Sequence, residues 1–341
     1  MQSKRVSYID IARGLAIIFV VYSHLLDRHD YRYLFYAFHM PFFFFLSGMF
    51  FRPDQDFLKT VAKSAMRLLV PYLTLALIMY AIWFVKLSNP AISDYTIKQF
   101  WSIFYANSNN GLMAFNNILW FLPTLFITRV FFAAIFKLTR RTKVLIANLV
   151  FLSVAAYLFS TFLPNTKLPF GTETAFSATV FYGMGSLWFQ QEKAQSILTK
   201  NKYLLFPLLL LMGGILATID FQNFGHQIDI RMNHLNNYFF FYFDAFCGIF
   251  GWLAFSIILN KNKLLEYIGR HSLAIFAWHP LAFKYIVFPL MGDLVKIASL
   301  AKIKIFFPII YTVIATGIIL FVDAIYQKTK TFLSKLTCKR P

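Results

Sequence analysis

Residues 8–26 read YIDIARGLAIIFVVYSHLL, an apolar run of membrane-spanning length that carries an arginine and a histidine. On an α-helix Arg13 and His24 lie within roughly 20° of the same face and about 16 Å apart along the axis. Ionisable side chains inside a membrane are costly, and they usually face a bundle interior or a wet cavity. The stretch therefore predicts a transmembrane helix with a cation and a titratable base on one functional face. The alternative is that Arg13 snorkels to one interface and His24 caps the other.

The rest of the chain repeats this apolar pattern. Of its 341 residues, 59% are hydrophobic, 20% are aromatic and only 14% are charged. A bilayer core of roughly 30 Å requires helices of about 20 apolar residues, and most of the chain consists of such runs. We predict an all-α polytopic membrane protein with a single integral-membrane domain over residues 1–341, built as a bundle of about ten transmembrane helices. The predicted spans are residues 8–26, 33–51, 67–87, 118–137, 144–163, 174–191, 203–220, 238–259, 267–289 and 303–326.

The basic residues divide between the two sides of these spans. Twenty-one of the 33 lysines and arginines fall on one set of connecting segments, which includes both ends of the chain, and nine fall on the other set. The positive-inside rule then places both termini in the cytoplasm. The net charge of +19 reflects this topology, so we expect no nucleic-acid partner. The basic C-terminal tail is expected to contact membrane lipids.

Sorting the polar groups of the spans by depth separates two chemistries. The predicted inner half collects four arginines: Arg13, Arg67, Arg129 and Arg270. The predicted outer half collects three histidines and an aspartate: His24, His39, His279 and Asp244. Arginine presents a fork of donors that matches phosphate oxygens, and a histidine near neutral pH can remove a proton from a hydroxyl. The pattern predicts a group transfer whose phosphorylated donor enters from the cytoplasm.

The connecting segments offer little chemistry of their own. Residues 88–117 have the polarity of a solvated surface loop, with one amphipathic turn around Phe100 and Trp101. The segment between the seventh and eighth spans contains His226, Asp229 and His234, but their spacing matches no metal-ligand pattern. We therefore expect no metal site.

Four stretches carry a resemblance to a known family. They are the Arg13 to His24 spacing, FHMPFFFFLSG at 38–48, LWFLP at 119–123 and IGRHSLAIFAWHP at 268–280. In this order the chain resembles the membrane acyltransferase-3 family along nearly its whole length. The members nearest in kind are sugar O-acetyltransferases, including the fucose 4-O-acetylase-like group.

The resemblance implies transfer of an acyl group, most often acetyl from acetyl-CoA, to a hydroxyl of a cell-envelope or exported glycan or of a lipid-linked sugar. It implies that Arg13 holds the phosphates of CoA and that His24 is the general base, in a multi-pass protein of a bacterial-type cytoplasmic membrane. His39 and His279 match motif positions, and they either bind the acceptor or orient His24. From their predicted depth in the membrane, we also assign Arg67, Arg129 and Arg270 as cofactor-binding residues and Asp244 as a substrate-binding residue.

Several alternatives remain open at this stage. His24 either activates the acceptor hydroxyl for direct attack or first takes the acyl group itself, and we favour direct attack because it avoids a buried cationic acyl-imidazole. A glycan exporter or flippase would use the same buried charges to line a path for a sugar phosphate across the membrane. A polysaccharide polymerase or ligase would usually need a larger outer catalytic loop than the segment 88–117. The chain ends soon after the last span, without the hydrolase-like domain of larger family members, so partner glycan-synthesis enzymes are possible.

Overall fold

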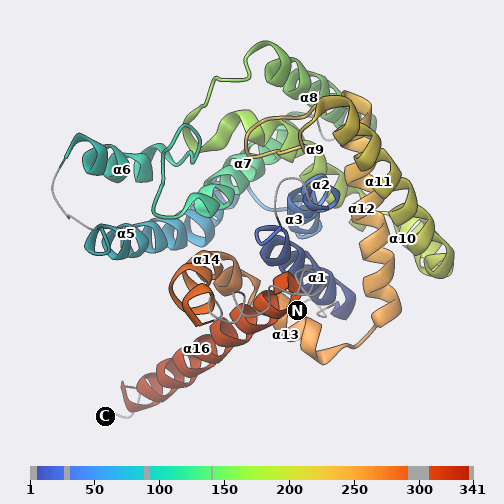
Figure 1. Cartoon of the computed structure of the whole chain (residues 1–341). Helices are drawn as coiled ribbons and strands as arrows, with labels where there is room; N and C mark the ends of the chain where they lie inside the picture. The colour runs from blue at the N-terminus through green and yellow to red at the C-terminus, as the bar shows by residue number, and fades with distance from the viewer. Residues whose placement is uncertain (1–5, 27–30, 88–92, 140, 291–306, 338–341) are drawn as a thin grey trace. The chain divides into compact units, whose positions relative to one another are not determined.

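The computed structural model describes residues 6–26, 31–87, 93–139, 141–290 and 307–337, with side chains described up to residue 331 (Figure 1). Within these ranges the regular structure is helical, and the one strand-like feature is an isolated bridge between Asp229 and His234. The prediction of an all-α protein is confirmed for this part of the chain. The chain forms two compact units: a terminal unit of Met1–Tyr31 with Leu259–Pro341, and a central unit of Arg32–Ile258. The prediction of a single domain over residues 1–341 stays a prediction.

The terminal unit joins the two ends of the chain through a close helix crossing. Its described helices are α1 (Ser7–Ser23), α13 (Lys263–Arg270), α14 (Ser272–Ala282), the π-helical η4 (Phe283–Val287) and α16 (Phe307–Thr337). At the crossing of α1 and α13, a Cβ on Gly14 would stand 2.3 Å from the Leu265 carbonyl oxygen, and one on Gly269 would stand 1.9 Å from that of Asp10. Small residues allow membrane helices to approach in this way.

The central unit packs around α9 (Thr172–Phe189), whose neighbours are α3 (His39–Gly48), α7 (Phe121–Thr139) and α8 (Thr142–Phe162). Glycines again set the closest approach, because a Cβ on Gly48 or Gly185 would clash with the backbone of the facing helix. The other described helices of this unit are α2 (Arg32–Tyr36), α4 (Phe57–Ser64), η1 (Ala65–Leu69), α5 (Val70–Val85), α6 (Asp94–Tyr105), η2 (Asn117–Trp120), η3 (Pro169–Gly171), α10 (Glu192–Lys200), α11 (Lys202–Phe224) and α12 (Tyr238–Leu259).

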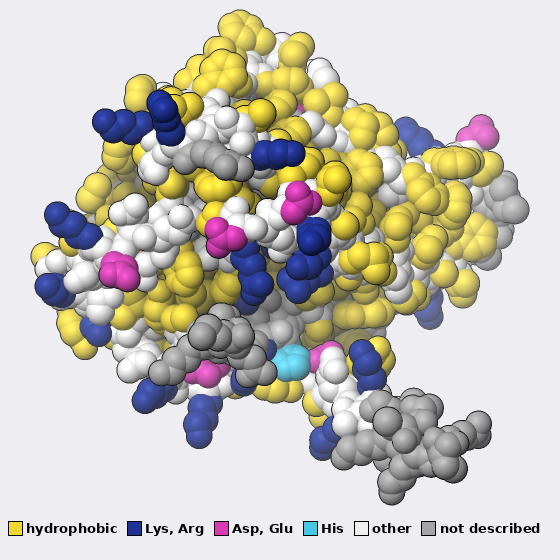
Figure 2. Space-filling view, turned by 180° about the vertical axis from the view of Figure 1, so that it is seen from behind, with side chains coloured by type: hydrophobic (Ala, Val, Ile, Leu, Met, Phe, Trp, Pro, Cys, Tyr) yellow, Lys and Arg dark blue, Asp and Glu magenta, His cyan; other side chains and the backbone are white. Residues whose placement is uncertain are grey.

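Seven helical segments in the described ranges are long and apolar enough to cross a membrane. They are Phe57–Val85, Asn117–Thr139, Thr142–Phe162, Lys202–Phe224, Tyr238–Leu259, Ser272–Leu290 and Phe307–Thr331. The remaining predicted spans correspond to α1 with 17 residues, to the α2 and α3 pair, and to α9 with 18 residues. Hydrophobic side chains cover much of the face in Figure 2. The protein is a multi-pass membrane protein, while the count of ten spans and the cytoplasmic termini stay predictions.

Two predicted spans differ in shape from the structure. The predicted span 33–51 consists of two helices, because α2 ends at Tyr36 and α3 begins at His39. Pro41 lacks the N–H that would continue the backbone ladder across this break. The predicted span 67–87 begins ten residues earlier, at Phe57, and passes through the π-helical segment Ala65–Leu69. Pro71 supplies no N–H to the carbonyl of Arg67, which favours this local rearrangement.

Two further expectations need correction. The predicted span 267–289 is divided at His271 between α13 and α14. The segment 88–117 contains a full helix, α6, and its asparagines are not solvated: Asn107 is 2% exposed and Asn109 3%. The side-chain nitrogens of Asn107 and Asn109 donate hydrogen bonds to the carbonyl oxygens of Leu168 and Arg231, so composition alone misled the prediction. Residues 303–306 of the last predicted span lie outside the described ranges.

Candidate functional site

His24 stands at the carboxyl end of α1. The last helical residue is Ser23, and His24 is the C-cap residue, with its backbone N–H 3.2 Å from the Val20 carbonyl oxygen. Because the backbone of His24 keeps right-handed helical angles, the predicted register between Arg13 and His24 is maintained. The side chain of His24 is exposed, whereas Ser23 is buried. An exposed imidazole can meet a substrate and exchange a proton with it.

A second histidine of the terminal unit lies against His24. His279 is on α14, and its ring centroid is 5.3 Å from that of His24, with an angle of 80° between the ring planes. The edge of one ring therefore meets the face of the other. His24 and His279 come from opposite ends of the sequence, so only the packing of the terminal unit brings them together.

The backbone of α14 determines which nitrogen of His279 carries the proton. His279 is fully buried, and its Nδ1 lies 3.0 Å from the Ile275 carbonyl oxygen and 2.9 Å from that of Phe276. Carbonyl oxygens only accept, so we assign the proton to Nδ1 and leave Nε2 as an acceptor. Pro280 has no N–H to offer the Phe276 carbonyl, which is why this oxygen can accept from His279. Among the described residues, Nε2 of His279 has no hydrogen-bond partner.

Arg13 lies on the same helix as His24, nearer to its amino end. Its guanidinium is 3.7 Å from the carboxylate of Asp10, and the two side chains are 31% and 8% exposed. Arg270 ends α13, is exposed, and has its guanidinium 6.0 Å from the centre of the Tyr267 ring. The terminal unit thus contains two of the four arginines that the sequence assigns to phosphate binding. Next to Arg270, Nδ1 of His271 is 2.5 Å from Oδ2 of Asp323 on α16.

The other two predicted arginines share a cavity in the central unit. Arg67 of η1 and Arg129 of α7 line a cavity of about 70 Å³ together with Arg52 and Lys63. The lining also includes Gln55, Thr60, Ser64 and Tyr182. Sequence reasoning did not assign Arg52 and Lys63 to the site. The four-residue spacing of Lys63 and Arg67, which places both on one helix face, was the available signal.

His39 and Asp244, the two remaining predicted substrate residues, belong to the central unit. His39 begins α3 and is 3% exposed, with Nδ1 2.6 Å from the Phe35 carbonyl oxygen and its ring 4.9 Å from that of Tyr36. Asp244 is 2% exposed on α12, next to Gly213 of α11. Its Oδ2 has no hydrogen-bond partner within the described ranges.

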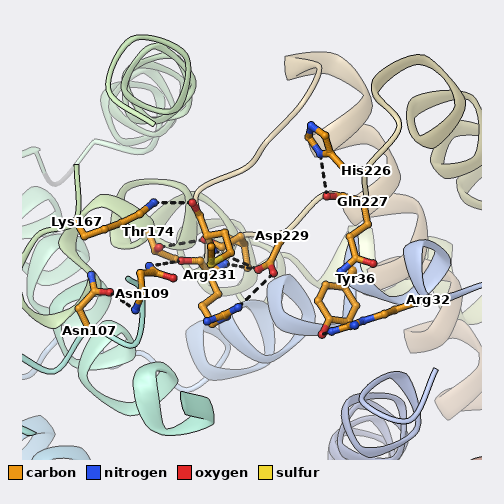
Figure 3. Close-up of polar contacts among 12 residues, drawn as sticks. Arg32, Tyr36, Asn107, Asn109, Lys167, Thr174, His226, Gln227, Asp229 and Arg231 are labelled. Carbon is orange, nitrogen blue, oxygen red and sulfur yellow. Dashed lines mark hydrogen bonds and ion pairs between the residues drawn. The ribbon is translucent and has the colours of Figure 1, made fainter. Parts of the chain in front are cut away.

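A clamped turn at residues 229–234 lies at the end of the central unit that contains Tyr36 (Figure 3). Three successive carbonyl oxygens of this turn accept hydrogen bonds from side chains of other segments: Thr174 binds Ile230 at 3.0 Å, Asn109 binds Arg231 at 3.0 Å and Lys167 binds Met232 at 2.7 Å. Burial lowers the pKa of Lys167 from its ordinary value. The sequence does not identify Asn109 or Thr174, because their partners are backbone atoms distant in the chain.

No group of three or more His, Cys, Asp or Glu side chains in the described ranges is arranged to hold a metal ion. The expectation of no metal site stays a prediction, since it concerns the whole chain.

Comparison with known proteins identifies the family. The profile of the acyltransferase domain, that of the acyltransferase-3 family, matches residues 6–327 and so covers both units. Comparisons with curated proteins and with solved structures gave no match. The matched range includes all four stretches that carry the sequence resemblance. The chain therefore belongs to the acyltransferase-3 family and is a membrane acyltransferase.

Proposed function

We propose that this protein transfers an acetyl group from cytosolic acetyl-CoA to a hydroxyl of a cell-envelope or exported glycan or of a lipid-linked sugar. His24 removes the proton of the acceptor hydroxyl, and the oxygen attacks the thioester carbonyl. The carbon–sulfur bond then breaks, and the CoA thiolate takes the proton from His24. The products are the acetyl ester and free CoA.

The observation that carries this proposal is the contact between the His24 and His279 rings. A general base must keep one ring nitrogen unprotonated and correctly aimed. The ring of His279 is fixed by backbone carbonyls of its own helix and presents an acceptor nitrogen, so it can accept a hydrogen bond from the one N–H of neutral His24. His279 is then a positioning residue, and His24 is the residue that touches the substrate.

Direct attack fits this pair better than an acyl-histidine intermediate. In direct attack the positive charge on His24 lasts only until the proton passes to the CoA thiolate, whereas the charge on an acyl-imidazole would remain beside the buried neutral ring of His279 until the acceptor attacks. With His279 held as an Nδ1–H tautomer, His24 can receive a proton and return it within one step. The surroundings of His24 therefore favour proton transfer over covalent catalysis.

The arginines supply sites for the phosphates of CoA. Arg13 and Arg270 offer guanidinium groups in the terminal unit, and Arg67 and Arg129 offer them in the central unit. Arginine binds phosphate through two parallel charge-assisted hydrogen bonds. His39 and Asp244 are proposed to bind the acceptor. The proposed location is the cytoplasmic membrane of a bacterial-type cell, where glycan-synthesis enzymes are possible partners.

The test compares envelope glycans from cells that carry the wild-type protein or His24→Ala. Mass spectrometry should find an acetylated glycan with the wild type, and its rate of formation should fall about 10²- to 10⁴-fold with the variant. His226→Ala changes an exposed histidine of an outer loop and serves as the matched control. Both variants should reach wild-type levels in the membrane.

Undiminished acetylation with His24→Ala would reject the proposed role. CoA-independent transport of a labelled lipid-linked sugar into vesicles would instead favour an exporter.

A further inference from the structure

A second cavity adjoins the cationic cavity of the central unit. It has a volume of about 520 Å³, within the range of small-molecule sites. The two cavities share Phe51, Gln55 and Thr60 as lining residues, so they are neighbours with a common wall. The smaller one, of about 70 Å³, has room for a group of a few atoms, since a water molecule occupies about 30 Å³.

The two cavities differ in charge. The small cavity is lined by four cationic side chains and no acidic one: Arg52, Lys63, Arg67 and Arg129. The large cavity is lined by the carboxylates of Asp54 and Asp56, with Lys137 as its cation. A phosphate is therefore attracted to the small cavity and repelled by the carboxylates of the large one. A ligand that fills both must carry its anionic part and its neutral part side by side.

The large cavity has the surfaces that a flat aromatic base requires. The rings of Phe51 and Phe136 meet edge to face at 5.1 Å, and Nζ of Lys137 lies 5.5 Å from the centre of the Phe57 ring. Aromatic side chains provide stacking surfaces for nucleobases. Carboxylates accept hydrogen bonds, which suits the exocyclic amine of adenine, and Lys137 can donate to its ring nitrogens.

We propose that the large cavity binds the adenine base of the donor while the small cavity binds an adjoining phosphate. The protein would then select CoA thioesters over thioesters of phosphopantetheine alone, such as those carried on a protein. This inference rests on the proposed function for the identity of the donor. It assigns ligand contacts to Phe136 and Asp54.

The binding test uses the full-length protein in nanodiscs of zwitterionic lipid. The ligands are CoA, 4′-phosphopantetheine, adenosine 3′,5′-bisphosphate and inosine 3′,5′-bisphosphate. The adenosine bisphosphate should compete with CoA, and it should bind more tightly than the inosine compound, whose base presents a carbonyl instead of the amine. Phe136→Ala should lower the affinity for CoA and for the adenosine bisphosphate about ten- to a hundredfold, as expected for a lost stacking contact. The affinity for 4′-phosphopantetheine should not change.

Two further variants keep this test interpretable. Phe162→Ala removes an exposed phenylalanine at the end of α8 and should leave every affinity unchanged. Asp54→Asn changes an exposed residue that should not affect folding, and it should narrow the preference for adenosine over inosine. Equal binding of the two bisphosphates, or no effect of both Phe136→Ala and Asp54→Asn, would overturn the inference.

The outcomes separate this inference from the proposed function. If acetyl transfer proceeds equally well from acetyl-CoA and from S-acetyl-4′-phosphopantetheine, the adenine site is wrong and the acyltransferase proposal stands. If adenosine 3′,5′-bisphosphate binds as expected but no glycan is acetylated, the nucleotide site stands and the proposed reaction fails. A second preparation adds phosphatidylglycerol to the nanodiscs. If this anionic lipid occupies the small cavity and no bisphosphate binds in either preparation, the cavity is a lipid site and the inference fails.

Discussion

Gly269 on α13 and Asp10 on α1 touch through their backbones: a Cβ on Gly269 would stand 1.9 Å from the Asp10 carbonyl oxygen. No rotamer relieves this clash, because the obstructing atom belongs to a helix backbone. The contact sets how closely the first helix packs against the segment that leads into α14. Since Asp10 is one helical turn from Arg13, the crossing also positions the helix that carries Arg13 and His24.

We therefore expect Gly269→Ala to force α1 and α13 apart and to destabilise the protein by about 1–3 kcal/mol. The measurement is the thermal unfolding midpoint of the purified protein in detergent. Gly317→Ala on α16 makes the same change where nothing lies within 4 Å, so its midpoint should stay unchanged or rise slightly. Equal midpoints for the two variants would contradict the close crossing.

Pro280 should matter because of the N–H that it lacks. In Pro280→Ala the new N–H competes with Nδ1 of His279 for the Phe276 carbonyl oxygen, so the tautomer of His279 is less well determined. We expect the transfer rate to fall about tenfold, and about 10²-fold or more in His279→Ala. Binding of CoA should be unchanged in both. A loss of CoA affinity equal to the loss of rate would argue against a positioning role for His279.

Thr174 should stabilise the turn at residues 229–234. Thr174→Val keeps the shape of the side chain but leaves the Ile230 carbonyl oxygen with only the backbone N–H of Asn233, 3.2 Å away, as a donor. The loss of this one hydrogen bond should cost about 0.5–1.5 kcal/mol. Faster limited proteolysis within residues 229–234 is the expected readout. Thr161→Val makes the same substitution at an exposed position whose hydroxyl bonds within its own helix, and it should digest like the wild type. An unchanged digestion of Thr174→Val would show that the clamp is unimportant.

Lys167 should make the free energy of unfolding depend on pH in the alkaline range. Because burial lowers its pKa in the folded protein, the folded state releases this proton before the unfolded chain does. The contribution of Lys167 to stability therefore increases as the pH rises towards 10.5, the ordinary value of lysine. Unfolding midpoints of the wild type and Lys167→Met at pH 8.5 and 10 should show a difference that shifts in favour of the wild type at the higher pH. A difference that shifts the other way would contradict this sign.

The sequence by itself determined the class of the protein. Apolar runs of membrane length predict spanning helices because the lipid core has no water to hydrogen-bond an irregular backbone. The spacing of Arg13 and His24 on one helix is also local, since helix geometry fixes the relation of residues within one segment. The four quoted stretches indicated the family, which the profile match confirms.

Local reasoning was least successful where prolines and buried amides act. It treated residues 33–51 as one span, although Pro41 allows a break before His39. It placed Asn107 and Asn109 in solvent, although both are buried and their side-chain nitrogens donate hydrogen bonds to distant segments. Pro41 is visible in the sequence and could have indicated the break, whereas the hydrogen-bond partners of Asn107 and Asn109 lie in segments far along the chain.

Only the tertiary structure paired His24 with His279 and gathered Arg67, Arg129, Arg52 and Lys63 around one cavity. These contacts join segments far apart in the chain, and no periodicity within a single helix encodes them. They depend on how closely the helices approach, which glycine backbones decide at Gly14, Gly48, Gly185 and Gly269. Helix geometry therefore set the residues that share a face, and helix packing set which faces meet.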